Sequence, residues 1–205
     1  MSHTDFQFSK SLSWLLRHGA CEEGFDLSPE GYLEVDKILQ HPKYKGKYFV
    51  ADITRVVAQD AKQRYRLRRN PLTSVLEIKA NQGHSIQSVS AEGLQPITTP
   101  KYQTVVHGTY FKCWDSIKRD GLNRMSRNHI HFAKGISRDG SVVSGLRKSA
   151  ELLIYVDLER ALADSLKFYE SENGVILTSG NERGFLKPQY FAKVVCVRTG
   201  DIIYP

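Results

Sequence analysis

The amino-acid sequence predicts an α+β protein in two parts, a winged-helix-like lobe followed by an antiparallel β-rich lobe. Apolar residues at helical spacing dominate the first part, which ends in two short strand patterns joined by a turn. Short strand patterns with few helices dominate the second part, which is typical of antiparallel sheets. Because turn-forming residues gather around 92–100, we expect the first lobe over residues 1–95, a linker over 96–100 and the second lobe over 101–205.

A first helix is predicted from Phe6 to His18, capped by Thr4 or Asp5, because leucines recur there at helical spacing. Gly19 follows at once, as it does at many helix ends. The Arg17-His18 pair then lies in the last turn, where the negative end of the helix dipole favours cations. Capping alone would explain such a pair, so a functional role needs support from elsewhere in the chain.

Short elements make up the rest of the first lobe. We expect a strand at Tyr32–Val35, a helix at Asp36–Leu39, a helix from Asp52 to Ala61, and strands at Lys62–Arg69 and Val75–Ala80. Asp36 and Asp52 are the expected N-caps of the two helices. Three helices followed by a two-stranded hairpin are the plan of a winged-helix-like lobe.

The predicted strand at Lys62–Arg69 is strongly basic, with five cations in eight residues. It places three arginines on one face and Tyr65 and Leu67 on the other, and strand periodicity alone does not distinguish among these arginines. Glu77 and Lys79 on the returning strand are expected to share the exposed face and to pair with them. Together with a net charge of +7, this cluster indicates a polyanionic partner such as nucleic acid.

Composition excludes several classes of protein. The chain has 205 residues, 40% of them hydrophobic and 25% charged, as in ordinary globular proteins. No apolar run approaches the ~20 residues of a membrane helix, and the first residues lack the features of a secretory signal. The three cysteines are isolated and fit neither a disulfide framework nor a metal site. We therefore expect an intracellular protein of the cytoplasm or nucleus with no membrane partner.

The second lobe contains several short strand patterns. They lie at Thr104–His107, His129–Phe132, Leu152–Leu158, Gly174–Thr178 and Phe191–Arg198, with helices at Trp114–Asp120 and Glu159–Asp164. The sequence has no dinucleotide-binding glycine fingerprint, no P-loop and no nucleophile elbow. Polar segments stand out instead at 81–85, 107–109, 127–132 and 144–147, and each by itself is compatible with an ordinary loop or strand end.

Taken in order, these segments resemble the RNA 2′-phosphotransferase family, whose members are also called tRNA 2′-phosphotransferases. The matching segments are Leu16–Gly19, Lys62–Tyr65, Ala80–Ser85, His107–Thr109, Arg127–Phe132, Ser144–Arg147 and Asn173–Thr178. Each motif alone is weak, but seven in order with fitting spacing cover nearly the whole chain. The resemblance implies an RNA-binding winged-helix lobe joined to an ADP-ribosyltransferase-like lobe that binds NAD⁺ as co-substrate.

The resemblance also implies a reaction and a partner. An internal 2′-phosphate of a spliced tRNA attacks the ribose anomeric carbon of NAD⁺ and expels nicotinamide, and O2″ of the adduct then attacks phosphorus. The products are RNA with a 2′-OH and ADP-ribose 1″,2″-cyclic phosphate. This chemistry needs no metal ion in principle, so arginines would supply the positive charge at the phosphoryl group. We expect a monomeric enzyme.

Residue-by-residue matching to the family gives a candidate site. The catalytic residues would be Arg17, His18, Arg64 and Arg127; the NAD⁺-binding residues His107, Gly108, Thr109, His131 and Arg147; and the RNA-binding residues Arg64, Asn81 and His84. Gly108 would allow close approach of NAD⁺. The sequence departs from the family at Lys79, where Arg is usual, and Lys lacks the bidentate fork of Arg.

Two other functions are compatible with parts of the sequence. The chain could transfer ADP-ribose to terminal phosphates of RNA or DNA and stop after the first step. It could also be an RNA-binding protein with an inactive second lobe. The first alternative has little need of the four phosphoryl-transfer residues, and the second predicts loss of the His107–Thr109 motif, but all are present.

Overall fold

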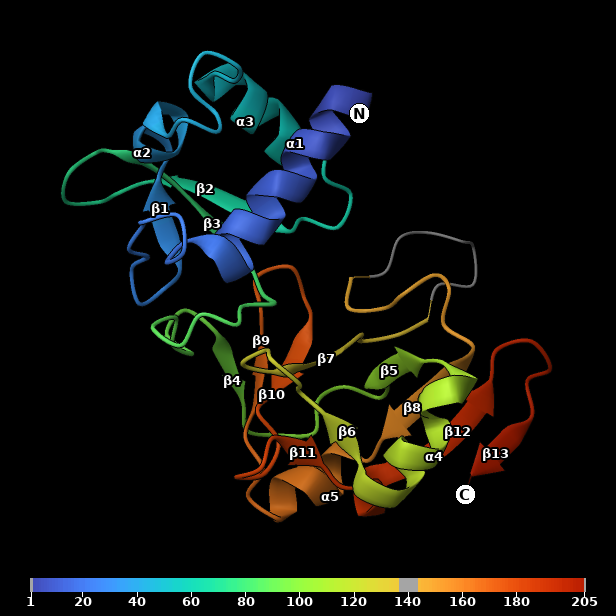
Figure 1. Ribbon diagram of the computed structural model, residues 1–205. Coiled ribbons are helices and arrows are strands. Elements are labelled where there is room, and N and C mark those ends of the chain that lie inside the picture. The colour runs from blue at the N-terminus through green and yellow to red at the C-terminus, as the bar shows by residue number, and fades with distance from the viewer. Residues whose placement is uncertain (1, 137–143, 205) are drawn as a thin grey trace. The chain divides into compact units, whose positions relative to one another are not determined.

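The computed structural model of the chain describes residues 2–136 and 144–204 and divides into two compact units, residues 1–93 and 94–205 (Figure 1). Each unit has its own hydrophobic core. All strand pairs in the described residues are antiparallel, and the helices do not alternate with parallel strands. The predicted α+β class with antiparallel sheets is therefore confirmed.

The first unit consists of three α-helices, one π-helical turn and a three-stranded sheet. Its elements are α1 (His3–Trp14), η1 (Leu15–Gly19), β1 (Tyr32–Glu34), α2 (Val35–Gln40), α3 (Val50–Ala58), β2 (Tyr65–Arg69) and β3 (Leu76–Ala80). The strand order is β1-β3-β2, so the predicted hairpin exists but carries β1 as a third strand. Apolar side chains of all three helices pack with those of one sheet face, where Leu33, Leu67 and Ile78 are in register.

The helix caps differ from those predicted. Ser2 caps α1: its hydroxyl accepts from the Asp5 N–H at 3.0 Å, and the Asp5 carboxylate accepts from the Ser2 N–H in return. Asp52 lies inside the first turn of α3, where its carboxylate accepts from the Phe49 N–H at 2.8 Å. Asp36 also lies within its helix, because that helix begins one residue earlier than predicted.

The first helix does not end as an α-helix, because its last residues widen into the π-helical turn η1. Leu15 and Leu16 are completely buried there. Gly19 is the last residue of this turn rather than a left-handed cap after it. A Cβ at Gly19 would lie 2.2 Å from the Trp14 ring, so close packing on that ring explains the glycine.

The second face of the first sheet carries charged side chains that are buried, not exposed as predicted. Glu77 and Lys79 are 8% and 6% exposed. The predicted cross-strand pair does form, since Nε of Arg68 donates to Glu77 at 3.0 Å. Tyr32 covers this face: the Arg68 guanidinium lies 3.5 Å from its ring centroid and Nζ of Lys79 lies 4.8 Å from it.

The described residues of the second unit form two four-stranded sheets and one two-stranded sheet. Its strands are β4 (Gln95–Ile97), β5 (Val106–Thr109), β6 (Leu122–Asn123), β7 (Ile130–Phe132), β8 (Leu152–Val156), β9 (Phe168–Glu170), β10 (Ile176–Thr178), β11 (Phe185–Leu186), β12 (Phe191–Cys196) and β13 (Ile202–Tyr204). Its helices are α4 (Phe111–Asp120), α5 (Leu158–Ala163) and the 3₁₀-helix η2 (Pro188–Tyr190). The sheet orders are β4-β9-β10-β7, β13-β12-β8-β5 and β11-β6.

The segment predicted as a linker begins with a strand. Gln95–Ile97 form β4, which pairs with β9, and Ile97 is 4% exposed in the core of the second unit. The proline and the threonines that suggested a linker therefore lie in and just after an edge strand, where proline is tolerated.

The two four-stranded sheets of the second unit meet near β5 and β7. An isolated bridge joins Val106 and Ala133, with both backbone N–H groups donating across it at 2.8–3.0 Å. Phe132, Ile154 and Phe168 are almost fully buried around this junction. The bridge therefore fixes the ends of β5 and β7, which carry two of the predicted histidines.

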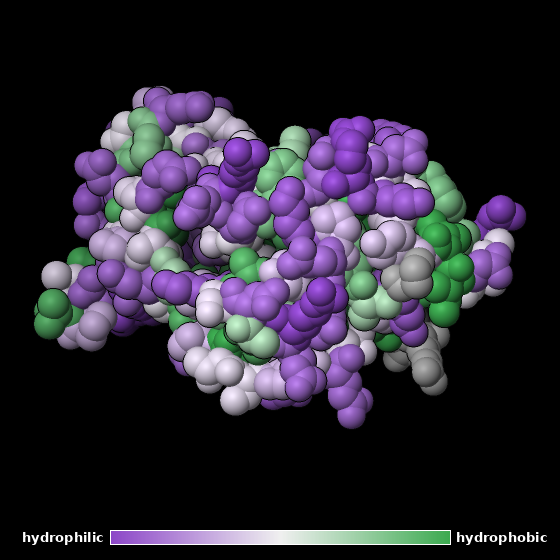
Figure 2. Space-filling view, turned by 90° about the horizontal axis from the view of Figure 1, so that it is seen from below, coloured by the Kyte–Doolittle hydropathy of each residue, from purple (hydrophilic) through white to green (hydrophobic). Residues whose placement is uncertain are grey.

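The face shown in Figure 2 is mostly hydrophilic, with hydrophobic residues in small separate areas. Among the described residues the most exposed large apolar side chains are Leu72, Met125, Phe49 and Ile202. No helix in the described ranges is long and apolar enough to cross a bilayer.

Candidate active site

The loop after β3 contacts the end of the first helix. The Ser85 N–H donates to the Arg17 carbonyl at 2.9 Å, and the Ser85 hydroxyl lies 2.9 Å from Nδ1 of His18. Gly83 has φ +94°, and a Cβ there would lie 3.2 Å from Nε of Arg17. The two segments matched separately in the sequence, 16–19 and 80–85, thus form one cluster in the first unit.

Ser85 also bears on which nitrogen of His18 can exchange a proton. The Ser85 hydroxyl lies 3.5 Å from the Arg17 carbonyl, to which it can donate. Its oxygen then accepts from Nδ1–H of His18, which leaves the lone pair of the ring on Nε2. In this arrangement Nε2 is the ring nitrogen of His18 that can accept a proton.

Arg64 lies just before β2 and is held by Asp60 and Asn81. Nη1 of Arg64 forms an ion pair with Oδ1 of Asp60, while the Arg64 N–H donates to the other carboxylate oxygen. The Asn81 N–H donates to the Arg64 carbonyl at 2.7 Å, and its side-chain amide donates to the Gln63 carbonyl at 2.7 Å. Asn81 is 8% exposed, so its contacts shape the backbone that carries Arg64.

The structure distinguishes Arg64 from Arg68, which the sequence pattern did not. Arg68 donates from Nη1 to Glu30 at 2.6 Å and from Nε to Glu77 at 3.0 Å. Its guanidinium is therefore neutralised on two sides and stacked on a ring. The matched residue His84 lies beside Gly31, with its Nε2 3.1 Å from where a Cβ of Gly31 would lie.

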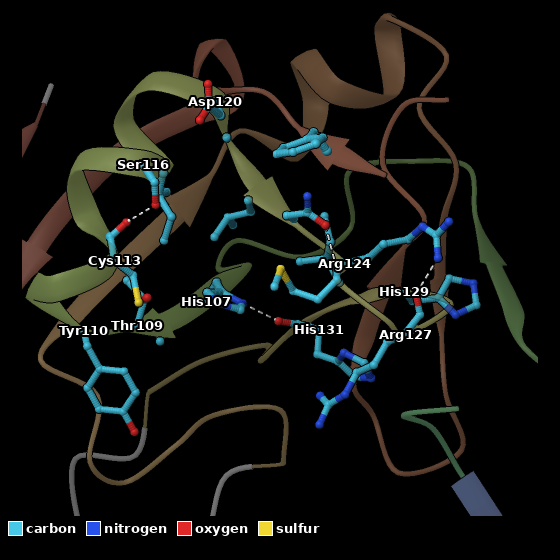
Figure 3. A pocket seen from close by; sticks show the side chains of 18 of the residues that line it. His107, Thr109, Tyr110, Cys113, Ser116, Asp120, Arg124, Arg127, His129 and His131 are labelled. Atoms are coloured by element: carbon cyan, nitrogen blue, oxygen red, sulfur yellow. Dashed lines mark hydrogen bonds between the residues drawn. The ribbon is translucent and has the colours of Figure 1, made fainter. Parts of the chain in front are cut away.

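The second unit contains a pocket of about 640 Å³, a size typical of small-molecule and cofactor sites. Figure 3 shows α4 along one wall, with Tyr110, Cys113, Ser116 and Asp120, and Arg127, His129 and His131 along another. All five residues assigned to NAD⁺ by resemblance line it, and so does the matched catalytic residue Arg127: they are His107, Gly108, Thr109, His131, Arg147 and Arg127.

His107 is held in a defined tautomer. Its Nδ1 donates to the His131 carbonyl at 2.8 Å, which leaves Nε2 as an acceptor (Figure 3). Burial lowers the pKa of His107; the hydrogen bond to His131 opposes this, and the charges of Arg147 and Arg127 add to it. His107 is therefore neutral at neutral pH and suited to accept a hydrogen bond from a ligand hydroxyl.

Arg127 lies in a loop that Arg124 closes. The Arg127 N–H donates to the Arg124 carbonyl at 3.2 Å, and Nη1 of Arg124 donates to the Arg127 carbonyl at 2.7 Å. Burial lowers the pKa of Arg127, and the positive charge of Arg147 lowers it further. Within residues 2–136 and 144–204 no carboxylate forms an ion pair with Arg127, so an anionic ligand would relieve this repulsion.

Other pocket residues have contacts that the sequence did not indicate. A Cβ at Gly108 would lie 2.8 Å from Cβ of Ala150 and 2.9 Å from Leu146, so this glycine is required by packing inside the protein. The Arg147 guanidinium lies 6.0 Å from the Tyr110 ring centroid. Thr109 is 6% exposed at the end of β5.

Three residues near these sites were missed from the sequence. The helix predicted to run to Ala61 placed Asp60 in a helical turn, whereas α3 ends at Ala58. Ser85 stands out in the sequence only as part of a motif, and Arg124 precedes the matched segment at 127–132. For Asp60, the sequence signal is its position four residues before Arg64, which suggests an ion pair between them. This signal is weak because such spacings are common.

The two units together define a class of protein. One unit has a pocket lined by two arginines and a neutral histidine, and the other presents a histidine and an anchored arginine, as expected for a protein that handles a phosphorylated ligand. Among the described residues no three His, Cys, Asp or Glu side chains lie together as in a metal site.

The chain belongs to the RNA 2′-phosphotransferase, Tpt1/KptA family, which it matches over residues 3–180. It is 43% identical over 192 residues to tRNA 2′-phosphotransferase 1 of Danio rerio, which covers 92% of this chain and 84% of the relative. The protein of the same name in Homo sapiens is 42% identical over 196 residues, covering 95% and 77%. The tRNA 2′-phosphotransferase of Saccharomyces cerevisiae is 37% identical over 182 residues, covering 85% and 79%. The chain is thus a transferase of this family, as the sequence motifs predicted.

Proposed function

We propose that this chain removes the internal 2′-phosphate from spliced tRNA with NAD⁺ as co-substrate. An oxygen of the 2′-phosphate forms a bond to C1″ of the NAD⁺ ribose while the bond to nicotinamide breaks. O2″ then forms a bond to phosphorus while the bond from phosphorus to the RNA 2′-oxygen breaks. The products are nicotinamide, RNA with a 2′-OH and ADP-ribose 1″,2″-cyclic phosphate.

The main observation in support is the uncompensated positive charge in the pocket of the second unit. Arg127 and Arg147 line this pocket together, and the proximity of Arg147 lowers the pKa of Arg127. A pyrophosphate or phosphate group would compensate both charges, and arginine matches two phosphate oxygens at once. We propose that this unit is an ADP-ribosyltransferase-like lobe that binds NAD⁺.

Within this lobe, neutral His107 accepts from a ribose hydroxyl through Nε2, and Thr109 and the backbone at Gly108 contact the nucleotide. His131 orients His107 through its carbonyl. By the resemblance, the glutamate of ADP-ribosyltransferases is absent from this lobe, and the region where it would be expected contains the apolar Val175, which is completely buried. A phosphate nucleophile is already anionic, so the first step needs no carboxylate base.

We propose that the first unit is a winged-helix-like lobe that binds the RNA. Arg17 and Arg64 hold the 2′-phosphate, with Arg127 adding charge stabilisation in the second step. His18 exchanges a proton at Nε2 with the RNA 2′-oxygen as it leaves. Asn81 and His84 support the RNA site from the loop after β3. These arginines supply positive charge at the transferring phosphoryl group.

We also propose that the enzyme acts as a monomer. Because spliced tRNA is found inside the cell, we place the reaction in the cytoplasm or nucleus.

The test is incubation of the protein with NAD⁺ and a labelled oligonucleotide that carries one internal 2′-phosphate. Denaturing gels over time should show conversion to 2′-OH RNA, with ADP-ribose cyclic phosphate as co-product. His18→Ala and Arg64→Ala should slow the second step more than the first, by on the order of 10²–10³, because they remove groups that act on the charge developing at phosphorus. RNA joined to ADP-ribose through the phosphate should accumulate in both variants.

Equal slowing of both steps, with no adduct at any time, would contradict these two assignments. An oligonucleotide with only a terminal phosphate serves as the second substrate. A stable ADP-ribosylated end, with no reaction at the internal 2′-phosphate, would instead identify a transferase that modifies terminal phosphates.

A further inference from the structure

Asp60 is a buried acid outside the set of residues matched to the family. Its side chain is 3% exposed, whereas that of its partner Arg64 is 36% exposed. Besides the ion pair with Nη1 of Arg64, its carboxylate accepts from the N–H of Arg64 and, at 3.4 Å, from the N–H of Lys62. One carboxylate thus binds both the backbone and the side chain of Arg64.

This anchoring leaves part of the Arg64 guanidinium available. Arginine has two donor edges, and the ion pair with Asp60 uses Nη1. In the described part of the chain no second carboxylate binds Nε or Nη2 of Arg64. The remaining Nε–Nη2 edge is a bidentate fork whose geometry matches two oxygens of a phosphate.

The backbone around Arg64 is fixed as well. Gln63 adopts a left-handed conformation with φ +46°, which is uncommon for a residue other than glycine. The Asn81 amide binds its carbonyl at 2.7 Å, and the Gln63 N–H donates to the Asp60 carbonyl at 2.8 Å. Arg64 is therefore attached at its backbone and at one edge of its side chain.

The neighbouring Arg68 shows the contrasting arrangement on the same hairpin. Glu30 binds its Nη1, Glu77 binds its Nε, and Tyr32 covers the face of its guanidinium. Both edges are occupied, so this side chain has a structural role and offers no fork to a ligand.

We infer that Asp60 is a positioning residue that directs the free edge of Arg64 toward the substrate phosphate. The inference rests on the proposed function and extends it to a residue that does not touch the substrate. When a group that stabilises a transition state is displaced by about 1 Å, the rate can fall by on the order of 10²-fold. Loss of the Asp60 carboxylate should therefore reproduce much of the defect of Arg64→Ala.

The experiment measures adduct formation and adduct resolution separately, in single turnovers of the full chain with NAD⁺ and 2′-phosphorylated oligonucleotide. Asp60→Asn should slow adduct resolution by on the order of 10²-fold while adduct formation changes much less. The matched control is Glu30→Gln, which removes a carboxylate from Arg68 and should leave both steps within about twofold of the parent. A purely structural role for Asp60 would slow both steps equally in proportion to the folded fraction.

A double-mutant cycle tests whether Asp60 acts through Arg64. Asp60→Asn should add almost nothing to the slowing already caused by Arg64→Ala. If Asp60→Asn does not fold, Asp60→Glu keeps the charge but displaces Arg64 by one methylene, and it should still slow resolution about tenfold. Parent-like resolution in a folded Asp60 variant, or full additivity with Arg64→Ala, would overturn the inference.

These outcomes are distinct from failure of the proposed function. If the parent enzyme leaves the 2′-phosphate in place, the proposed function fails and the inference fails with it. If Arg64→Ala accumulates adduct but Asp60→Asn and Asp60→Glu resolve it at the parent rate, only the inference about Asp60 is wrong.

Discussion

Acidification from pH 7 to pH 5.5 is expected to destabilise the second unit because His107 remains neutral in the folded state. Nδ1 of His107 donates to the His131 carbonyl, and burial, reinforced by Arg147 and Arg127, lowers the pKa of His107. The unfolded chain takes up a proton near the ordinary histidine pKa of about 6.5, whereas the folded unit does so only at lower pH. The unfolded state then binds more protons, so the free energy of unfolding falls as the pH falls.

The size of the effect follows from the number of such groups. Each histidine contributes at most about 1.4 kcal/mol per pH unit between its unfolded and folded pKa values. The pKa of His129 is also lowered by burial and by Arg124, so the two histidines together give at most about 2.7 kcal/mol per pH unit. Carboxylates with lowered pKa values, such as Asp120 and Glu170, add their losses mainly below about pH 5.

Urea unfolding at several pH values, followed by tryptophan fluorescence, measures the slope of the free energy of unfolding against pH. The chain has two tryptophans, so Trp14→Phe leaves Trp114 as a reporter of the second unit, where it packs edge-on against Tyr204. In this background His107→Gln, which keeps a donor for the His131 carbonyl, should reduce the slope by up to about 1.4 kcal/mol per pH unit. Equal slopes with and without His107 would refute the reasoning.

Two further predictions concern the first unit. Gly19→Val should destabilise it by about 1–3 kcal/mol, measured by chemical denaturation and circular dichroism, because the new Cβ would lie 2.2 Å from the Trp14 ring. The same change should cost much less in a Trp14→Ala background, and an equal cost there would show that the ring is not the cause. For RNA binding, Arg64→Ala should reduce the slope of log K against log salt by about 0.7, whereas Arg68→Ala should leave it unchanged. Equal changes in the two slopes would contradict the distinction between these arginines, since two glutamates already neutralise Arg68.

The longer elements could be predicted from the sequence because their periodic patterns are local. The hairpin of β2 and β3, helix α4 and strand β12 lie within three residues of their predicted bounds. The strands β4, β6, β9, β11 and β13, each of two or three residues, were missed. Such strands are defined by a partner distant in sequence, as β4 is by β9, and no local pattern indicates that partner.

The candidate site was predictable as a set of residue types but not as a set of contacts. Motif matching named Arg64 without distinguishing it physically from Arg68, since both alternate with apolar residues on one strand pattern. What distinguishes them is the acid each one meets, Asp60 in one case and Glu30 with Glu77 in the other. Likewise Glu77 was expected at the surface because it is charged, and only the tertiary structure shows its burial.

The pairing of β4 with β9 determines where this chain can be cut into fragments. A fragment that starts at residue 101, the boundary that turn-forming residues suggest, would lack β4 and expose an edge of β9 along with the core position of Ile97. Exposed strand edges promote association between molecules. A fragment that starts at residue 94 keeps the whole four-stranded sheet, so it is the appropriate piece for isolating the pocket and measuring nucleotide binding without the first unit.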